Sequence, residues 1–598
     1  MLHVHSKIVR ILRLCLAVTF IGGLYLITKS LTSGSETTLK SDILDTNRFL
    51  QFKTSGKESL AKHIQNSESH DLVKDTIDEK FLRELDEQTM KCPDYTEYSK
   101  HKHAPFSTGQ HNFPYMRPVP KCRTFVSNAV EKVITDLKDK VQDPDMGRLI
   151  ENCLPNTLDT TILWHQNSDS EEPQSFVVTG DIHAEWLRDA ARQLSVYQPF
   201  IKHDNSLKTL IRGAINTQAK YVINSPYCNA FHPPRGSHVK KGNSAIDNVY
   251  PRPDWKSVFE CKYELDSLAS FLTLSNEYFD HSEGDASFIT SSWLRAFEKL
   301  LIVLKRESQP SFDDKTGQAL SYYYSFQRQT NIGSETLPLA GVGNPVNFGT
   351  GLIRSAFRPS DDATILQFFI PANIHMLVEL KKARSFYLNH KHVKSNSANS
   401  MFEVVDTFIE NISMGIEKYG IVQHPVYGKV YAYEVDGYGS VLFMDDANVP
   451  SLLSIPDLGY LSVNDEVYQN TRKMILSKSG NPYYLVGKYF EGIGGPHVGI
   501  YNAWPMSLLI QIRTTDDDNE IMKNLKLIMD STAGFGLMHE SIHVNSRLYD
   551  YTRSWFAWCN SEFGKTILHL AKFKPHLIFK KEFSQSPYNI DSILSNLK

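Results

Sequence analysis

The stretch Trp293-Leu294-Arg295-Ala296-Phe297-Glu298-Lys299-Leu300-Leu301-Ile302-Val303-Leu304 decides the fold class, because its large apolar residues recur at steps of three and four. This spacing places them along one stripe of an α-helix, the face that packs on a core. The segments 130–141 and 207–222 show the same period. Strand-like alternation is rare and local, as in residues 429–433. Further helices are expected at 183–197, 262–279, 362–384, 400–418, 441–453, 464–478, 502–513, 516–530 and 554–572.

The predicted fold class is therefore all-α, with an (α/α)6 toroid or barrel over residues 92–598. About a dozen helices of ordinary length are typical of helical hairpins packed in a ring. A solenoid would normally show a sequence repeat, and this sequence has none of fixed period. The connections 223–260 and 334–360 are rich in Pro, Gly, Asn and Tyr. They are too long for plain connectors and are typical of functional loops.

The N-terminus predicts a membrane anchor. Basic residues surround the start of an apolar run over residues 8–28, about the 20 residues that a helix needs to span a bilayer. The positive-inside rule leaves residues 1–7 in the cytosol and the rest of the chain on the lumenal side. A cleaved signal peptide is the alternative, but no clean small-x-small cleavage site follows the run. We expect a single-pass type II membrane protein of the Golgi or endoplasmic reticulum, with residues 29–91 as a polar lumenal stem.

The cysteines and one sequon fit such a compartment. Cys92–Cys122 and Cys228–Cys261 are the pairs nearest in sequence, although spacing does not determine connectivity and buried free thiols are an equally good explanation. Asn411 begins the one Asn-x-Ser/Thr triplet of the chain and is a candidate glycosylation site.

Charge and motifs exclude several classes of function. The net charge is −3 and the pI is about 6.7, so no basic field attracts nucleic acid. Neither metal-type Cys/His spacing nor a phosphate-binding glycine loop is present in the sequence. The acidic pairs 361–362 and 445–446 leave calcium or magnesium as an alternative, but they lack further ligands at fixed offsets. We expect no cofactor, no metal and no nucleic-acid partner.

A first polar segment, around Trp186, has the composition of a sugar-binding surface. Thr179 or Asp181 is expected to cap a helix, which would place Asp181, Arg188 and Asp189 on one face. Carboxylates and a guanidinium bind sugar hydroxyls, and an indole covers the C–H patch of the ring. An ion-pair ladder along an exposed helix is the alternative interpretation.

Two acidic segments more than 270 residues apart could supply a catalytic pair, since two carboxyl groups usually break a glycosidic bond. Glu264 and Asp266 would point about 200° apart on a helix, so only one could face a substrate. The spacing does not decide which. Glu540 stands between His539 and Ser541, whose hydrogen bonds could keep it ionised, as a water-activating base requires. A satisfied buried network is the alternative.

Two further segments carry polar residues at expected helix starts or loops. In the run Arg358-Pro359-Ser360-Asp361-Asp362, one Asp is expected to cap a helix and the other to bind sugar. Asp445-Asp446 repeats this pattern. The glycine-rich segment 492–497 and the helix start that follows it are expected to place His497 and Trp504 at a pocket rim.

Together these segments resemble glycoside hydrolase family 125, the exo-acting α-1,6-mannosidases, and especially its fungal membrane-anchored members. The resemblance implies an (α/α)6 barrel and an inverting, metal-independent mechanism. It makes Asp266 the general acid and Glu540 the general base, with Glu264 in a supporting role. The matching stretches are 151–159, 180–189, 262–267, 357–363, 494–497 with 504–505, and 539–558.

The expected activity is the removal of non-reducing terminal α-1,6-linked mannose from glycans in the secretory pathway. A glycan-binding protein that keeps the pocket without turnover is one alternative, and an exo-glycosidase for another hexose is a second. The residues expected to bind the glycan are Asp181, Trp186, Arg188, Asp189, Arg358, Asp361, Asp362, His497, Trp504, His539 and Trp555.

Overall fold

The computed structural model describes residues 91–166, 172–387, 396–546 and 550–595. The predicted tail, membrane span and nearly all of the stem lie outside these residues. Within the described ranges, no helix is both long and apolar enough to cross a bilayer. Residues 87–598 form one unit by their mutual contacts, and this unit is described below.

Five helices buried on nearly all sides form the inner layer of this unit. In α8 and α15 every residue is buried, which is typical of helices at the centre of a large core. Helix α8 packs against α10 and α17, α10 also packs against α12, and α15 packs against α17. The inner helices are α8 (Leu187–Ser195), α10 (Leu265–His281), α12 (Ile370–Phe386), α15 (Pro505–Arg513) and α17 (Ala557–Phe573).

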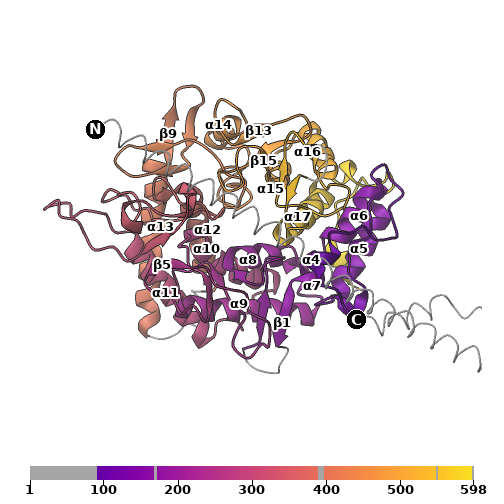
Figure 1. Ribbon diagram of the computed structural model, residues 1–598, viewed down its shortest axis with the longest axis horizontal. Helices are drawn as coiled ribbons and strands as arrows, with labels where there is room; N and C mark the ends of the chain where they lie inside the picture. The colour runs from indigo at the N-terminus through magenta and orange to yellow at the C-terminus, as the bar shows by residue number, and fades with distance from the viewer. Residues whose placement is uncertain (1–90, 167–171, 388–395, 547–549, 596–598) are drawn as a thin grey trace, which may run out of the picture. The chain divides into compact units, whose positions relative to one another are not determined.

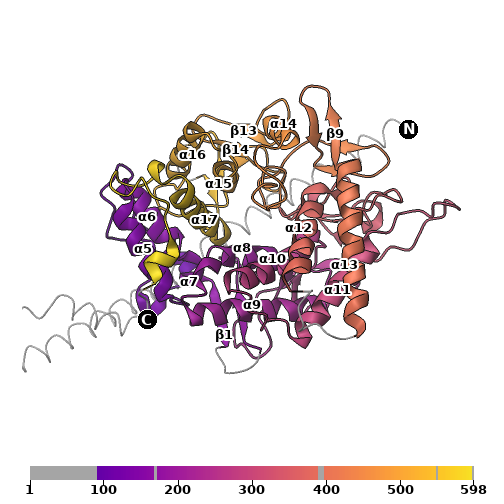
Figure 2. The same cartoon turned by 180° about the vertical axis from the view of Figure 1, so that it is seen from behind.

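Amphipathic helices cover this layer from outside (Figures 1 and 2). Helix α11 buries the stripe that includes Trp293, Phe297, Leu300 and Leu304, as its period predicts. Helix α11 packs against α9, α13 against α12, and α16 against α15. The remaining helices are α4 (Tyr95–Tyr98), α5 (Asn128–Lys140), α6 (Pro144–Cys153), α7 (Asn156–Thr160), α9 (Asn205–Asn224), α11 (Ser291–Glu307), α13 (Asn396–Gly415), α14 (Glu466–Ile475), α16 (Asp518–Asp530) and α18 (Ile590–Leu594). These two layers of helices are consistent with the expected (α/α)6 fold.

Short strands are more frequent than the sequence predicted. In the described ranges, the structure has three three-stranded sheets, and strands of each sheet come directly before inner helices in the sequence. These sheets are β3-β4-β6, β8-β11-β12 and β15-β16-β17. The predicted strand at 429–433 is confirmed as β10. The strands are β1 (Ile162–Gln166), β2 (Gln174–Val177), β3 (Glu185–Trp186), β4 (Ala230–Phe231), β5 (Asp247–Tyr250), β6 (Val258–Glu260), β7 (Ser325–Arg328), β8 (Phe368–Phe369), β9 (Ile421–His424), β10 (Gly428–Tyr431), β11 (Glu434–Val435), β12 (Val441–Leu442), β13 (Tyr484–Val486), β14 (Glu491–Ile493), β15 (Asn502–Ala503), β16 (Ser541–His543) and β17 (Tyr551–Thr552).

Most predicted helices are confirmed, but the helix at 441–453 is wrong. This segment is short strand β12 followed by turns. Asp445 is fully buried there and accepts the backbone N–H groups of Leu452 and Leu453 at 2.8 and 3.0 Å. Burial raises the pKa of Asp445 to about 8. A side chain therefore makes the backbone hydrogen bonds that a helix would have made, an alternative that Asp offers readily.

Both expected disulfides are present. Cys92–Cys122 joins Cα atoms 5.4 Å apart, and Cys228–Cys261 links the loop after α9 to the start of α10. Cys153 and Cys559 are buried free thiols, so both interpretations of the cysteines hold, each for different residues.

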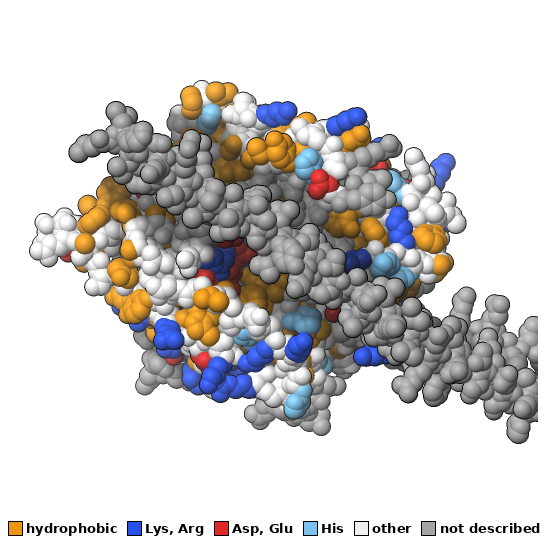
Figure 3. Space-filling view, viewed as in Figure 1, with side chains coloured by type: hydrophobic (Ala, Val, Ile, Leu, Met, Phe, Trp, Pro, Cys, Tyr) orange, Lys and Arg blue, Asp and Glu red, His pale blue; other side chains and the backbone are white. Residues whose placement is uncertain are grey.

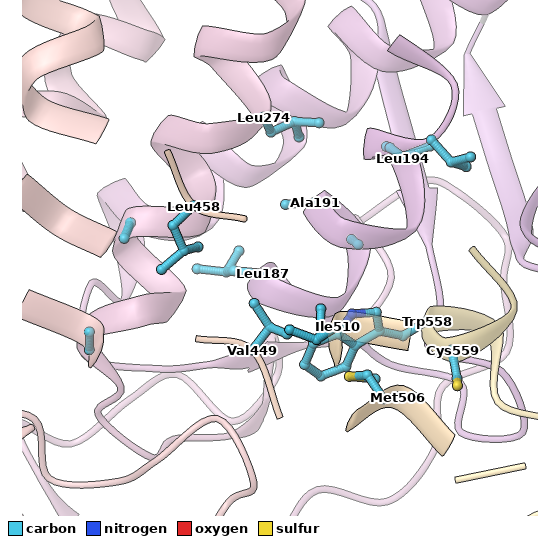
Figure 4. Packing of buried hydrophobic residues seen from close by; sticks show 14 of the residues in the cluster. Leu187, Ala191, Leu194, Leu274, Val449, Leu458, Met506, Ile510, Trp558 and Cys559 are labelled. Carbon is cyan, nitrogen blue, oxygen red and sulfur yellow. The ribbon is translucent and has the colours of Figure 1, made fainter. Parts of the chain in front are cut away.

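A buried ion network joins α8, α15 and α17 inside the apolar core. Glu562 accepts from Arg192 Nε at 2.7 Å and from Arg513 Nη2 at 2.6 Å. Asp457 pairs with the same two arginines at 3.2 and 2.8 Å. Leucine, methionine and isoleucine side chains pack in this region (Figure 4). Charges in such surroundings are stable only when they are paired.

Glu562→Gln is expected to lower the free energy of unfolding by about 3–5 kcal/mol, because it leaves two buried arginines with one carboxylate. Burial opposes the charge of Glu562, but Arg192 and Arg513 outweigh it and lower its pKa to about 2. The stabilisation should therefore be complete above the ordinary range of a Glu, and be lost as the pH falls towards 2. Urea unfolding from pH 7 downwards measures both effects.

The control is Lys526→Gln, which removes an exposed ion pair with Asp530 on α16. Such pairs contribute about 0–1 kcal/mol. Equal small losses in both variants would show that the buried network does not hold the helices together.

Candidate active site

One pocket collects residues from segments far apart in the sequence, at the N-terminal ends of α8, α15 and α17. Its volume is about 50 Å³. Acidic and basic side chains gather in a hollow on one face of the molecule (Figure 3). The lining residues are Thr179, Ile182, Trp186, Arg188, Asp189, Pro359, Ser360, Asp361, Asn448, His497, Trp504, Glu540, Arg553, Phe556 and Trp558.

Arg188 is the central cation of this pocket. Its Nη1 donates to Glu264 Oε2 at 2.6 Å and to Asp266 Oδ2 at 3.3 Å. Its Nη2 pairs with Asp189 Oδ1 at 3.2 Å, and its guanidinium lies 5.4 Å from the ring centre of Trp558. Arg188 is 2% exposed. A guanidinium buried this deeply requires the carboxylates around it.

Glu264 and Asp266 contact the same guanidinium, and neither of them lines the pocket. Helix α10 begins at Leu265, and Glu264 precedes it in extended backbone. The 200° separation of a helix therefore does not apply. Burial raises the pKa of both carboxyl groups, that of Asp266 to about 6. Asp266 Oδ1 has no hydrogen-bond partner, so the pair is suited to hold a proton.

Asp266 does not itself line the pocket; it lies one contact away, through Arg188. Asp189 does line the pocket, and burial raises its pKa to about 6 although Arg188 opposes this shift. The site thus holds two candidate proton donors, and only the second is in the pocket wall.

Glu540 is more than 270 residues away from these acids in the sequence, and it also lines the pocket. It is held there by Arg553. Arg553 Nε donates to Glu540 Oε1 at 3.1 Å, and its Nη1 donates to Asp181. His539 is fully buried and donates from Nδ1 to the Arg553 carbonyl at 2.9 Å. Burial lowers the pKa of His539 to about 4. His539 thus positions Arg553, which pairs with Glu540 at the pocket surface.

The segment 180–189 is not one helix, so the predicted capping and shared face are wrong. Gly180 has φ +142°, and the chain passes through bends and β3 before α8 starts at Leu187. Trp186, at the N-cap, lines the pocket, whereas Asp181 reaches the site through Arg553. The glycine permits a turn that a residue with a side chain rarely adopts.

The helix expected to start at Asp361 and Asp362 is also wrong there, because α12 begins only at Ile370. Asp361 has φ +67° and lines the pocket. Burial opposes its charge, but Lys262 and Arg188 outweigh it and lower its pKa to about 2. Asp362 accepts from Ser360 at 3.0 Å, and burial raises its pKa to about 6. Sequence proximity alone could not separate these two environments.

Aromatic rings form much of the remaining wall. Trp186 and Trp504 line the pocket, and each has a buried Nε1 without a hydrogen-bond partner. Trp558 also lines it and donates to Glu562 at 3.1 Å. Trp555 does not line it and packs edge-on against Tyr95 instead. Indole rings and free N–H donors suit a ligand with C–H faces and hydroxyls.

The structure thus brings most of the predicted residues together. Arg358 lies in a neighbouring cavity instead. Arg553, Trp558 and Asn448 were missed, although the first two belong to a segment recognised in the sequence. Their signal was an Arg and a Trp in the segment that follows Glu540 in the sequence. The predicted residues that line the pocket are Trp186, Arg188, Asp189, Asp361, His497, Trp504 and Glu540.

The structure describes the surroundings of two further predictions, the glycosylation of Asn411 and the absence of a metal, but it does not test either of them. Asn411 lies within α13 and is half-buried. No group of three or more His, Cys, Asp or Glu side chains is arranged for a metal ion in the ranges that the structure describes.

Comparison with known proteins identifies the class of this site. The sequence matches, over residues 143–568, the family described as metal-independent alpha-mannosidase (GH125). The protein is a glycoside hydrolase. The chain belongs to glycoside hydrolase family 125, which confirms the resemblance seen in its motifs.

Two relatives support this assignment. The meiotically up-regulated gene 157 protein of Schizosaccharomyces pombe is 54% identical over 501 residues, which cover 84% of this chain and 96% of the relative. A solved metal-independent alpha mannosidase of Streptococcus pneumoniae, described as a non-productive complex with alpha-1,6-mannobiose, is 32% identical. Its TM-score is 0.66, over 75% of this chain and 99% of the other.

Proposed function

We propose that this enzyme is an inverting exo-α-mannosidase that removes non-reducing terminal α-1,6-linked mannose from glycans. The observation that carries the proposal is the small pocket in which Glu540 faces the Arg188 cluster. Its lining combines carboxylates, a guanidinium and indole rings, the groups that bind the hydroxyls and the C–H face of a sugar. The linkage preference is supported by the α-1,6-mannobiose bound to the relative from Streptococcus pneumoniae.

In the proposed reaction Asp266 protonates the leaving glycosidic oxygen and Glu540 takes a proton from water. That water attacks the anomeric carbon from the opposite face of the ring, so the configuration inverts. Burial supports the acid form of Asp266, and Arg553 supports the charge of Glu540. Trp186 and Trp504 would cover the C–H face of the mannose, while Arg188, Asp189, Asp361 and His497 would bind its hydroxyls.

Asp266→Asn and Glu540→Gln are each expected to lower kcat on α-1,6-mannobiose by about 10²–10⁴-fold or more, the usual contribution of a general acid or base. Asp189→Asn is the matched variant for the rival proton donor. α-Mannosyl fluoride distinguishes them, because fluoride leaves without protonation. Asp266→Asn should regain most of its rate on the fluoride, and Glu540→Gln should not.

If Asp189→Asn and not Asp266→Asn is rescued by the fluoride, Asp189 is the acid. Unchanged unfolding curves for the variants show that the loss is chemical.

NMR of the first product made by the unmodified enzyme should show β-mannose, and α-mannose would contradict inversion.

Binding and hydrolysis assays with the same enzyme preparation distinguish the proposed function from its two alternatives. A glycan-binding protein would bind mannobiose without releasing mannose, and an enzyme for another hexose would prefer a glucoside. Parallel assays of α-1,6-, α-1,3- and α-1,2-mannobiose and a glucoside therefore test the activity and its linkage preference together.

The rate is expected to fall with rising pH above about 6, the raised pKa of the Asp266 carboxyl. The acid must be protonated to act, so the protonated fraction and kcat/KM decrease tenfold per pH unit above its pKa. A profile of kcat/KM from pH 4 to 9 measures this limb. On α-mannosyl fluoride, which needs no protonation, both the unmodified enzyme and Asp266→Asn should lack the limb, and a limb that persists in Asp266→Asn would assign it to another group.

We further propose that the chain is anchored in the Golgi or endoplasmic reticulum by residues 8–28, with its catalytic unit in the lumen. The support is the apolar run of the sequence and the two disulfides, which are typical of oxidising compartments. Protease added to intact microsomes should digest an N-terminal tag and spare the catalytic unit. Release of the protein by alkaline carbonate would contradict the anchor.

A further inference from the structure

A cavity of about 620 Å³ lies beside α9, one of the outer helices (Figures 1 and 2). Its walls come from α9, from residues 232–235 after β4 and from residues 254–257 before β6. Among the residues that the structure describes, this cavity and the pocket of Glu540 share no lining residue. Its volume is typical of small-molecule sites, roughly 300–1,000 Å³. It is therefore a place where a second ligand could bind.

Three cationic side chains line this cavity. Lys220 comes from α9, and Arg235 and Lys256 come from the two loops. Asp254 is the one acid among the described lining residues, and its carboxylate lies 3.4 Å from the Arg235 guanidinium. Neither Lys220 nor Lys256 forms an ion pair within the described part of the chain. The wall therefore carries an excess of positive charge, which attracts an anionic group.

The remaining wall combines apolar surface with neutral polar groups. Tyr221, Pro233 and Pro234 contribute apolar surface, and Gln174 and Asn224 contribute side-chain amides. A sugar ring needs both, because its C–H face packs on apolar side chains while amides exchange hydrogen bonds with its hydroxyls. The cavity thus suits a sugar as well as an anion.

His232 offers the cavity wall a fixed hydrogen-bond acceptor. Its Nε2 lies 2.7 Å from Ser244 Oγ, which lies 3.1 Å from the carbonyl oxygens of Trp255 and Val258. Ser244 donates to one of these carbonyls, so His232 Nε2 carries the proton and Nδ1 is a bare acceptor. Burial lowers the pKa of His232, which keeps the ring neutral. Nδ1 is buried without a hydrogen-bond partner in the described structure, and such an acceptor is costly unless a bound molecule donates to it.

We propose that this cavity is a second, non-catalytic binding site for a sugar that carries a phosphate group. Lys220 and Lys256 bind the phosphate, since two unpaired cations match the charge of a phosphate monoester, about −1.5 to −2 at pH 7. Tyr221 and Pro233 contact the ring, and a hydroxyl donates to His232. The inference does not depend on the proposed activity, because none of these residues lines the pocket of Glu540. Such a site would retain the protein on phosphorylated glycans without occupying the active site.

Isothermal titration calorimetry of the full chain with mannose 6-phosphate tests the proposal. Lys220→Glu and Lys256→Glu should each weaken binding about tenfold or more, because each replaces attraction to the phosphate with repulsion. Hydrolysis of 4-nitrophenyl α-mannoside should stay unchanged in both variants. Lys299→Glu is the matched control, since Lys299 is an exposed cation of α11 that does not line the cavity. It should alter neither binding nor hydrolysis.

Mannose and inorganic phosphate are the comparison ligands, and each should bind about tenfold more weakly than mannose 6-phosphate. Equal affinity for mannose would overturn the recognition of phosphate, and equal affinity for inorganic phosphate would overturn the recognition of a sugar. Binding of mannose 6-phosphate that both folded reversals retain in full would lie elsewhere on the protein and would overturn the site. Failure of the unmodified enzyme to hydrolyse mannosides, with this binding intact, would overturn the proposed activity alone.

Discussion

The neutralisation of buried arginines on α8 is the constraint on which the rest of the structure depends. Arg188 cannot remain charged inside the protein without Glu264 and Asp266, which come from the start of α10. One helical turn further along, Arg192 has the same need and meets Glu562 of α17. Both arginines thus connect the inner helices, and Arg188 also lines the pocket.

The charges around the pocket and the charges that pair the inner helices therefore both centre on α8. Around Arg188 the carboxyl groups have different proton affinities: the pKa of Asp361 is lowered to about 2, whereas those of Asp266 and Asp189 are raised to about 6. Carboxyl groups whose pKa values are pushed apart are what acid and base roles require. Arg358 is paired in the same way, because Glu434 holds it while its Nη2 has no hydrogen-bond partner.

The sequence predicted the helices well where an apolar stripe was present, as in α11, and failed where side chains replaced backbone hydrogen bonds. Asp445 binds two backbone N–H groups and prevents the helix expected at 441–453. Gly180 turns the chain before α8, so Asp181 leaves the face on which a helix would have placed it. Seven of the predicted site residues line one pocket, and the motifs that pointed to them resemble those of a known family, whereas Arg553 was noticed only in the fold.

The sequence by itself determined where most helices form and which segments are rich in acids and tryptophans, because these depend on spacing along the chain and on motif. Only the tertiary structure decided which acids share a guanidinium, which of them reach the pocket wall and which donors remain free. The physical reason is that a proton affinity is set by burial and by neighbouring charges. Those neighbours come from helices hundreds of residues apart.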